Sequence, residues 1–264
     1  MKWKPFIVCY ALALTLLLVA QRHPNQAQAT PAGFSGVVDL THLLDEKAPN
    51  WEGSKKSPFE ARQVASIQKD GYFARTVCLP EHFATHIDAP AHFAPGLWTV
   101  DQIPTERLIA SLVVIDVSGK VRGDPDYQLS VADVAEWEKA NGQIPQGAVV
   151  LARTGWDSRW SSMQEYRNAD AKGVMHFPGY SREAARFLVE GRNIVGLGID
   201  TLSVDAGEEK SFPVHRYTMR HSLYHVENVT NLDRVPEAGA VVVVAPAKLA
   251  GGSGGPVRVL ALLR

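Results

Sequence analysis

The sequence predicts a single mixed α/β domain, and three observations support this fold class. Seven short runs rich in Val, Ile and Leu are bounded by Gly, Pro or Asp, which is typical of strands. Two longer segments open with helix-capping residues and interleave with the strands through the middle of the chain, while strand runs occupy both ends. Residues 30–264 are enough to bury one sizeable core, and they contain no internal repeat and no low-complexity linker.

The predicted strands are short and apolar. They are expected at residues 36–40, 72–79, 112–117, 148–153, 194–198, 238–245 and 257–262. Between the last two runs lies the Gly-rich tract 251–256, which is too short to tether two domains. We expect it to be a loop that closes over a site or forms a subunit contact.

The two predicted helices are identified by their ends. A helix is expected at 130–140, because this segment opens with Ser130-Val-Ala-Asp133, which resembles a capping box. A second helix is expected at 181–190, where Ser181 is a candidate N-cap and Gly191 follows the last helical residue.

The first 29 residues are predicted to be a signal peptide. Lys2 and Lys4 form a basic start, residues 6–20 are almost entirely apolar, and Ala27-Gln-Ala29 has the small residues of a cleavage site. The apolar run is shorter than the ~20 residues that a membrane-spanning helix needs. We therefore expect an exported protein, periplasmic or secreted, whose functional domain comprises residues 30–264.

Composition excludes two classes of partner. Removing Lys2, Lys4 and Arg22 with the signal peptide reduces the 27 Lys and Arg residues to 24, against 28 Asp and Glu. Nucleic acid and anionic lipid are therefore excluded as main partners, no membrane association is expected after cleavage, and a small-molecule substrate is expected. Only Cys78 remains, so no intramolecular disulfide forms, and its thiol is expected to be a buried apolar group.

Four potential metal ligands or proton carriers lie close together at the spacing His82-x3-His86-x-Asp88-x3-His92. His82 and His86 would be about 6 Å apart on a helical turn but roughly 13 Å apart on a strand. Because metal–nitrogen bonds are only about 2 Å long, a shared ion requires a helical turn or tight loop between them. Pro90 prevents a helix from continuing, so an extended chain is expected from His86 onward, with Asp88 and His92 on the same side.

A site with two metal ions needs further ligands, which the segment 215–232 contains. His215 and Glu227 would be about 18 Å apart on a straight helix, so both reach one ion only if the chain turns between them. One or two helical turns within 215–224, followed by a reversal into 226–232, would produce that turn. His221 and His225 form an i,i+4 pair and are rival candidates, and the residue types alone leave the choice open.

These residues resemble the cyclase-like metal hydrolases, a group that includes bacterial kynurenine formamidases and isatin hydrolases. The resemblance rests on His-x3-His-x-Asp-Ala-Pro-x-His-Phe at 82–93, on Gly-Leu-Gly-Ile-Asp-Thr-Leu-Ser-Val-Asp at 196–205, and on His215 followed by Glu227-Asn. It extends from Asp-Leu-Thr-His at 39–42, through Arg-Thr-Gly-Trp at 153–156, to the stretch 228–232. It implies a swivelling β/β/α fold, a homodimer or homotetramer, and one or two divalent ions, zinc or manganese.

The resemblance also implies which residues hold the ions. One ion would be held by His82, His86 and Asp88, and Asp88 would bridge to a second ion held by His215 and Glu227. This assignment favours His215 and Glu227 over His221 and His225.

The implied reaction is hydrolysis of an amide, a formamide or a cyclic amide. Water activated by metal attacks the carbonyl, and His92 accepts the water proton and passes it to the leaving nitrogen. Trp51, Phe83 and Phe93 are candidates to wall an aromatic substrate. Similar proteins usually have Gly where this chain has Ala84, so a positive φ there would strain the loop. Because formylkynurenine is metabolised inside cells, an exported relative is expected to act on another substrate.

Two other functions fit part of the pattern. His86, Asp88 and His215 match the two-histidine, one-carboxylate set of non-haem Fe(II) oxygenases, which leaves His82 and His92 without a role. An exported metal-binding protein without catalytic activity would need no acid–base residue beyond its ligands. Oxygen consumption with added Fe(II) distinguishes the oxygenase from the hydrolase.

Overall fold

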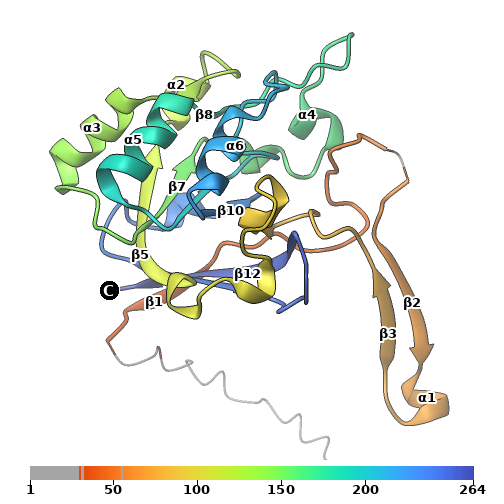
Figure 1. Cartoon of the computed structure of the whole chain (residues 1–264). Coiled ribbons are helices and arrows are strands. Elements are labelled where there is room, and N and C mark those ends of the chain that lie inside the picture. The colour runs from red at the N-terminus through yellow and green to blue at the C-terminus, as the bar shows by residue number, and fades with distance from the viewer. Residues whose placement is uncertain (1–29, 31–32, 55) are drawn as a thin grey trace, which may run out of the picture.

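A curled eight-stranded sheet forms the centre of the molecule (Figure 1). The computed structural model describes residues 30, 33–54 and 56–264, so the predicted signal peptide lies outside the described residues. The strand order is β1-β12-β11-β5-β7-β9-β10-β4, and β12 also pairs with β4. This additional pairing connects the last strand of the order back to the second, so the sheet is barrel-like. The predicted mixed α/β fold class is confirmed.

The sheet combines parallel and antiparallel pairs. Its strands are β1 (Gly36–Asp39), β4 (His86–Asp88), β5 (Ile109–Asp116), β7 (Val149–Arg153), β9 (Gly196–Ile199), β10 (Tyr224–Glu227), β11 (Val241–Pro246) and β12 (Gly254–Leu263). Strands β5, β7, β9 and β10 are parallel to one another, and the other pairings are antiparallel. Every predicted strand run overlaps an observed strand whose ends are displaced, whereas β4 and β10 are too short to show a strand pattern of their own.

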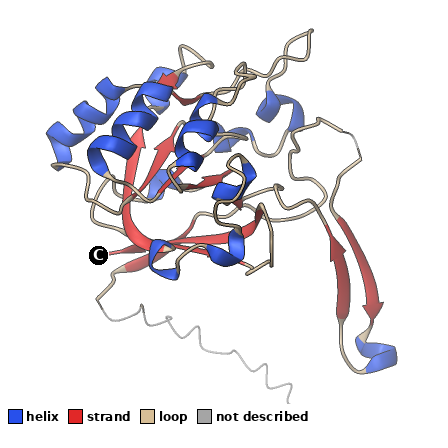
Figure 2. Ribbon diagram, in the orientation of Figure 1, coloured by secondary structure: helices blue, strands red, loops and turns tan. Residues whose placement is uncertain are grey.

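The helices pack mainly on one side of the parallel strands (Figure 2). They are α1 (Ile67–Asp70), α2 (Ser118–Val121), α3 (Val131–Asn141), α4 (Met163–Arg167), α5 (Arg182–Arg192) and α6 (Pro213–Arg220). Two further short pairs of strands are β2 (Glu60–Ala65) with β3 (Ala74–Cys78), and β6 (Gln128–Leu129) with β8 (Gly179–Tyr180). Among the described residues, no helix has the length and hydropathy needed to cross a bilayer.

Both faces of the parallel strands are buried, which explains their continuous apolar sequences. On β7, Val150 and Ala152 belong to the cluster that includes Trp137 and Leu188 beneath the helices. Leu151, on the opposite face of the same strand, belongs to a second cluster within the curled sheet. The alternation of side chains along a strand therefore divides one apolar run between two cores.

Capping residues define the ends of the two long helices. The predicted capping box of α3 is confirmed, because the Ser130 hydroxyl accepts from the Asp133 backbone N–H and the Asp133 carboxylate accepts from the Ser130 N–H. Ser181 caps α5 by accepting from the backbone N–H of Ala184. The predicted end of this helix is wrong: Gly191 is still helical, and Asn193 ends the helix with φ of 48°. Asn tolerates this left-handed conformation because its side chain is short and polar.

The hairpin β2–β3 projects from the body of the molecule (Figure 1). Its side chains are mostly exposed, because no layer formed by the described residues covers either face of the ribbon. Two predictions fail here. Tyr72 and Phe73 lie in the turn of the hairpin rather than in a strand, and Cys78 is exposed rather than buried.

His42 provides a prediction about stability at low pH. Its ring stacks on Trp160 with centroids 3.9 Å apart, and burial lowers its pKa to about 4. An unfolded chain binds a proton at this histidine below about pH 6.5, whereas the folded chain does not. The stability that His42 contributes is therefore complete above pH 6.5 and is lost as the pH falls toward 4.

The variant His42→Phe retains the stacked ring and removes the titration. Between pH 7 and pH 5, the unsubstituted chain is expected to lose about 2 kcal/mol of its free energy of unfolding through His42. The variant is expected to keep this amount. Urea unfolding at both pH values measures this difference, and His221→Phe, at an exposed histidine, is the control. Equal pH dependence of the His42→Phe variant and the unsubstituted chain would contradict the prediction.

Candidate metal centre

Two short paired strands place four polar side chains on one face of the sheet. In the antiparallel register of β4 and β10, His86 lies opposite Glu227 and Asp88 lies opposite His225. Residues opposite one another, and residues two apart on one strand, point to the same face. The His86 Nε2 atom is accordingly 3.1 Å from an Asp88 oxygen and 3.4 Å from a Glu227 oxygen.

Helix α6 brings His215 to the same point. Its Nε2 atom lies 3.4 Å from Asp88 Oδ2 and 3.3 Å from Glu227 Oε1. The Asp205 carboxylate holds the first turn of this helix by accepting from the backbone N–H groups of Val214 and His215, at 2.8 and 3.2 Å. It also accepts from His215 Nδ1 at 2.6 Å. Asp205 therefore fixes the position of the helix and the orientation of the imidazole.

The hydrogen bonds of His86 and His215 determine which ring nitrogen faces the carboxylates. His86 Nδ1 donates to the carbonyl of Ala84 at 2.9 Å, and His215 Nδ1 donates to Asp205. In each ring, Nε2 is therefore the nitrogen directed at Asp88 and Glu227. Metal-binding histidines are oriented in this way by a partner on the other ring nitrogen.

His82 is oriented by the Gly-rich tract. The Ser253 hydroxyl donates to Glu81 at 2.7 Å, so its oxygen accepts from His82 Nε2 at 2.9 Å. The other nitrogen, Nδ1, faces Asp88 Oδ1 at 2.5 Å. The tract 251–256 thus lies against the site, and its last residues are part of β12.

The expected tight loop between the first two histidines is present. The His82 and His86 rings are 5.3 Å apart between centroids, and the chain turns at Ala84 with φ of 55°. The Ala84 carbonyl accepts from His86 and from the Asn228 amide. Ala84 therefore has a left-handed backbone conformation that favours glycine, and its carbonyl orients the predicted ligand His86.

This geometry predicts the effect of two substitutions at Ala84. We expect Ala84→Val to lower the free energy of unfolding by about 2 kcal/mol, because a β-branched residue is strained at positive φ and this site is closely packed. Ala84→Gly, the matched control, is expected to change the free energy of unfolding by less than about 1 kcal/mol. Glycine relieves the backbone strain, and this gain offsets the greater conformational entropy of the unfolded chain. Equal unfolding midpoints in urea for both variants would contradict the strain at this position.

The buried charges of the cluster attract positive charge. Burial lowers the pKa of His86, but the carboxylates of Asp88 and Glu227 outweigh this effect and raise it to about 9. Burial likewise opposes a rise for His215, yet Asp205, Asp88 and Glu227 hold its pKa well above the ordinary value. Burial raises the pKa of Asp88, and the surrounding imidazoles hold it well below the usual range. The donor set of imidazoles and carboxylates therefore suits a divalent cation.

His92 lies beside this cluster on a different backbone element. The chain is extended only from His86 to Asp88, and residues Pro90–His92 form a short 3-10 helix, so the expected extended course to His92 is wrong. Pro90 starts this turn, as its fixed φ favours. The His92 ring stacks on His82 at 3.9 Å, with the planes 25° apart. Burial lowers the pKa of His92 to about 4, so its imidazole is neutral and able to accept a proton.

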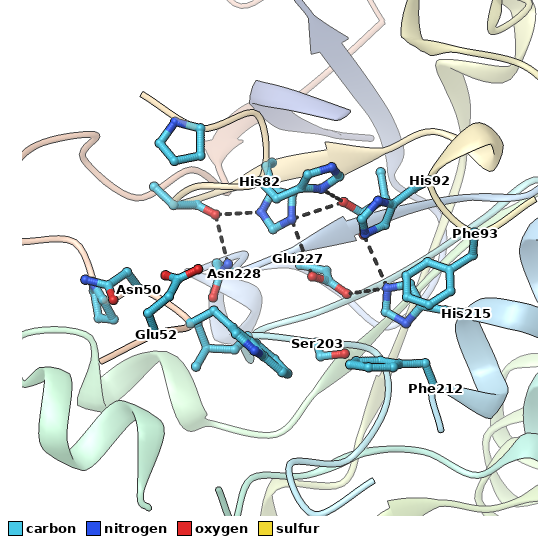
Figure 3. A pocket seen from close by; sticks show the side chains of 17 residues that line it. Asn50, Glu52, His82, His92, Phe93, Ser203, Phe212, His215, Glu227 and Asn228 are labelled. Carbon is cyan, nitrogen blue, oxygen red and sulfur yellow. Dashed lines mark hydrogen bonds and ion pairs between the residues drawn. The ribbon is translucent and has the colours of Figure 1, made fainter. Parts of the chain in front are cut away.

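A cavity of about 440 Å³ opens over the cluster. Trp51 and Phe93 line it, as does Phe212, whose ring is 5.4 Å from that of Phe93 (Figure 3). Phe83 does not line the cavity: it is 3 % exposed and packs with Ala48. Adjacent residues on a chain point in different directions, so Phe83 faces the core while His82 faces the site.

Not all predicted candidates have the same surroundings. His221 is exposed and bonds the backbone carbonyl of Tyr217, whereas His225 is fully buried beside His215. Asp88, His215, His225 and Glu227 have ligand atoms within 4.8 Å of one another, and so do His82, Asp88 and His92.

Comparison with known proteins gives consistent matches. The Cyclase family, described as "Putative cyclase", matches residues 38–206. Isatin hydrolase of Roseibium aggregatum is 35 % identical over 247 residues, covering 88 % of this chain and 93 % of that protein. Kynurenine formamidase of Bacillus cereus is 25 % identical over 222 residues, covering 84 % and 94 %.

Solved structures agree with these relatives. Isatin hydrolase A from Ralstonia solanacearum superimposes with a TM-score of 0.80 at 35 % identity, covering 87 % of this chain and 92 % of that one. A structure described as a potential metal-dependent hydrolase with cyclase activity has a TM-score of 0.66 at 25 % identity, covering 87 % and 98 %.

Proposed function

Because the chain belongs to the Cyclase family and its relatives hydrolyse amides, we propose that it is a metal-dependent hydrolase of an aromatic amide, formamide or cyclic amide. One observation carries the proposal. Imidazoles and carboxylates from β4, β10 and α6 converge at the floor of a cavity whose walls include Trp51, Phe93 and Phe212. The floor suits a divalent ion and the walls suit an aromatic ring.

The proposed ligands are the five residues predicted from the sequence. His82, His86 and Asp88 would hold one ion, and Asp88, His215 and Glu227 would hold a second, with zinc or manganese as the metal. A bound divalent ion supplies hydroxide from water at neutral pH and polarises a carbonyl group.

The other residues orient the substrate and move the proton. We assign proton transfer to His92, because its neutral ring faces the cavity and rests on His82 rather than on a carboxylate. As the C–N bond breaks, water contributes its oxygen to the carbonyl carbon, and His92 transfers the water proton to the nitrogen. The aromatic walls hold the ring of the substrate and exclude water from its apolar face.

The proposal is tested with the purified mature chain and a substrate panel. With added Mn²⁺ or Zn²⁺, we expect hydrolysis of isatin or of formanilides, measured as release of the acid, and loss of activity after dialysis against a chelator. Lactones are the comparison substrates, since they lack the C–N bond. If esters and lactones are cleaved and no amide is, the proposed bond specificity is wrong.

We also propose that the protein acts outside the cytoplasm as a homo-oligomer. The basic start, apolar run and cleavage pattern of residues 1–29 support export, and the exposed apolar side chains of Tyr72 and Phe73 support self-association. Cell fractionation with N-terminal sequencing is expected to detect a chain starting at Thr30. Light scattering of the purified chain is expected to give a mass above that of one copy; a cytoplasmic monomer would contradict both expectations.

A further inference from the structure

His225 is a buried histidine that the proposed ligand set leaves unused. It lies on β10 with no exposed surface, directly opposite Asp88 in the strand register and two residues before Glu227. Its side chain therefore points to the same face of the sheet as these two carboxylates. Its ring centroid is 4.6 Å from that of His215, with the planes nearly perpendicular.

The neighbouring hydroxyl determines the protonation of the ring. The Thr218 hydroxyl donates to the carbonyl of Val214 at 2.8 Å, within α6. Its oxygen then accepts from His225 Nε2, which is 2.7 Å away. Because a neutral imidazole has one N–H, Nδ1 of His225 carries a lone pair and no proton.

This free nitrogen has no hydrogen-bond partner among the described residues, although it is buried. Leaving a buried acceptor unsatisfied is unfavourable, so a buried nitrogen without a protein partner points to a ligand that binds it. The predicted ligands His82, His86 and His215 have the same arrangement, in which an outer partner binds one nitrogen and the other is directed into the cluster. His225 thus meets the structural criterion that identifies the other ligands.

We propose that His225 is a further protein ligand, through Nδ1, of the divalent ion held by Asp88, His215 and Glu227. Each of these four buried residues offers a ligand atom, and the four atoms lie within 4.8 Å of one another, so small side-chain shifts bring them to one ion. The second site then has two imidazoles and two carboxylates, one of which it shares with the first site. This inference rests on the metal-dependent function proposed above and concerns only the second ion.

The same pattern of a histidine two residues before a carboxylate occurs on both strands. His86-x-Asp88 on β4 and His225-x-Glu227 on β10 are the same alternation, and antiparallel pairing places each histidine opposite a carboxylate. The two strands therefore form a square of alternating imidazole and carboxylate groups, which offers nitrogen and oxygen donors to both ions.

The test measures metal binding rather than activity. In calorimetric titrations with Zn²⁺ and with Mn²⁺, His225→Phe is expected to weaken binding of one ion by about 100-fold or more and to leave the other nearly unchanged. His221→Phe, an exposed histidine four residues earlier, is the matched control and is expected to bind both ions as the unsubstituted chain does. Unfolding monitored by circular dichroism verifies that each variant is folded.

Two further variants keep the proposal testable if His225→Phe does not fold. Thr218→Val removes the hydrogen bond that fixes the His225 ring, and it is expected to weaken the binding of the second ion about 10-fold. His225→Gln retains a polar group and is expected to change the visible spectrum of bound Co²⁺, which reports the ligands of the ion.

The outcomes separate this inference from the proposed function. If the unsubstituted chain binds neither Zn²⁺ nor Mn²⁺, the metal-dependent function itself is wrong. If it binds two ions and the affinities and Co²⁺ spectra of the His225 variants equal those of the unsubstituted chain, only the assignment of His225 is overturned.

Discussion

Replacing Asp88 by Asn is expected to abolish metal binding and to lower the rate of amide hydrolysis by about 10³-fold or more. Both oxygens of this carboxylate face the cluster: Oδ1 lies near His82 and His86, and Oδ2 lies near His215. No other side chain contacts as many of the proposed ligands in the described part of the chain. Asn has nearly the same shape but lacks the negative charge, so it leaves the imidazoles without a shared counter-charge.

The measurement combines metal content of the dialysed protein with steady-state hydrolysis. The control is Asp233→Asn, because Asp233 is an exposed carboxylate in the short 3-10 turn Leu232–Arg234. It is expected to retain metal and activity. Full metal occupancy in Asp88→Asn would show that the ions bind elsewhere, and the proposed centre would then be abandoned.

The second large effect is expected at His92, and it separates proton transfer from metal binding. His92→Ala is expected to retain both ions, because the ring is stacked on His82 and, among the described residues, forms no hydrogen bond or ion pair with Asp88 or Glu227. Turnover is expected to fall by about 10²–10⁴-fold, the range typical of a general acid–base group. Metal content and kcat are measured on the same preparation.

A suitable control is His176→Ala, which removes a partly exposed histidine that pairs with Asp126 at 2.8 Å and does not line the cavity. It is expected to leave kcat unchanged. Near-normal turnover of His92→Ala would contradict the proton-transfer role. Oxygen uptake with Fe(II), in place of hydrolysis, would instead support the oxygenase alternative that His86, Asp88 and His215 permit.

The predictions from sequence were most accurate where the signal is local. Ser130 and Asp133 form the expected capping box, because a cap depends on residues three apart. The helical turn or tight loop between His82 and His86 followed from metal–nitrogen bond lengths and the assumption of a shared ion, and the structure has a tight loop there. The glycine that similar proteins usually have at position 84 raised a positive φ only as a condition for strain, and Ala84 has this φ.

Predictions that needed the direction of a side chain were less accurate. Phe83 neighbours a predicted ligand but packs into the core, while Phe212, which no pattern identified, lines the cavity. Asp205 belonged to a recognised motif, yet its contact with His215 depends on where α6 begins. Cys78 was expected to be buried and is exposed, because the hairpin projects beyond the layers of the fold.

The sequence by itself determined the mixed α/β class, the ends of the main helices to within a few residues, and the chemistry of the site as imidazole and carboxylate. These depend on residue type and on spacing along a short stretch of chain. Residue types left the donors of the second site open, and a family resemblance selected among them. Only the tertiary structure decided how the donors converge, because the pairing of β4 with β10 and the packing of α6 bring together residues more than a hundred positions apart. Such contacts are set by strand register and helix packing over the whole core, which no short segment encodes.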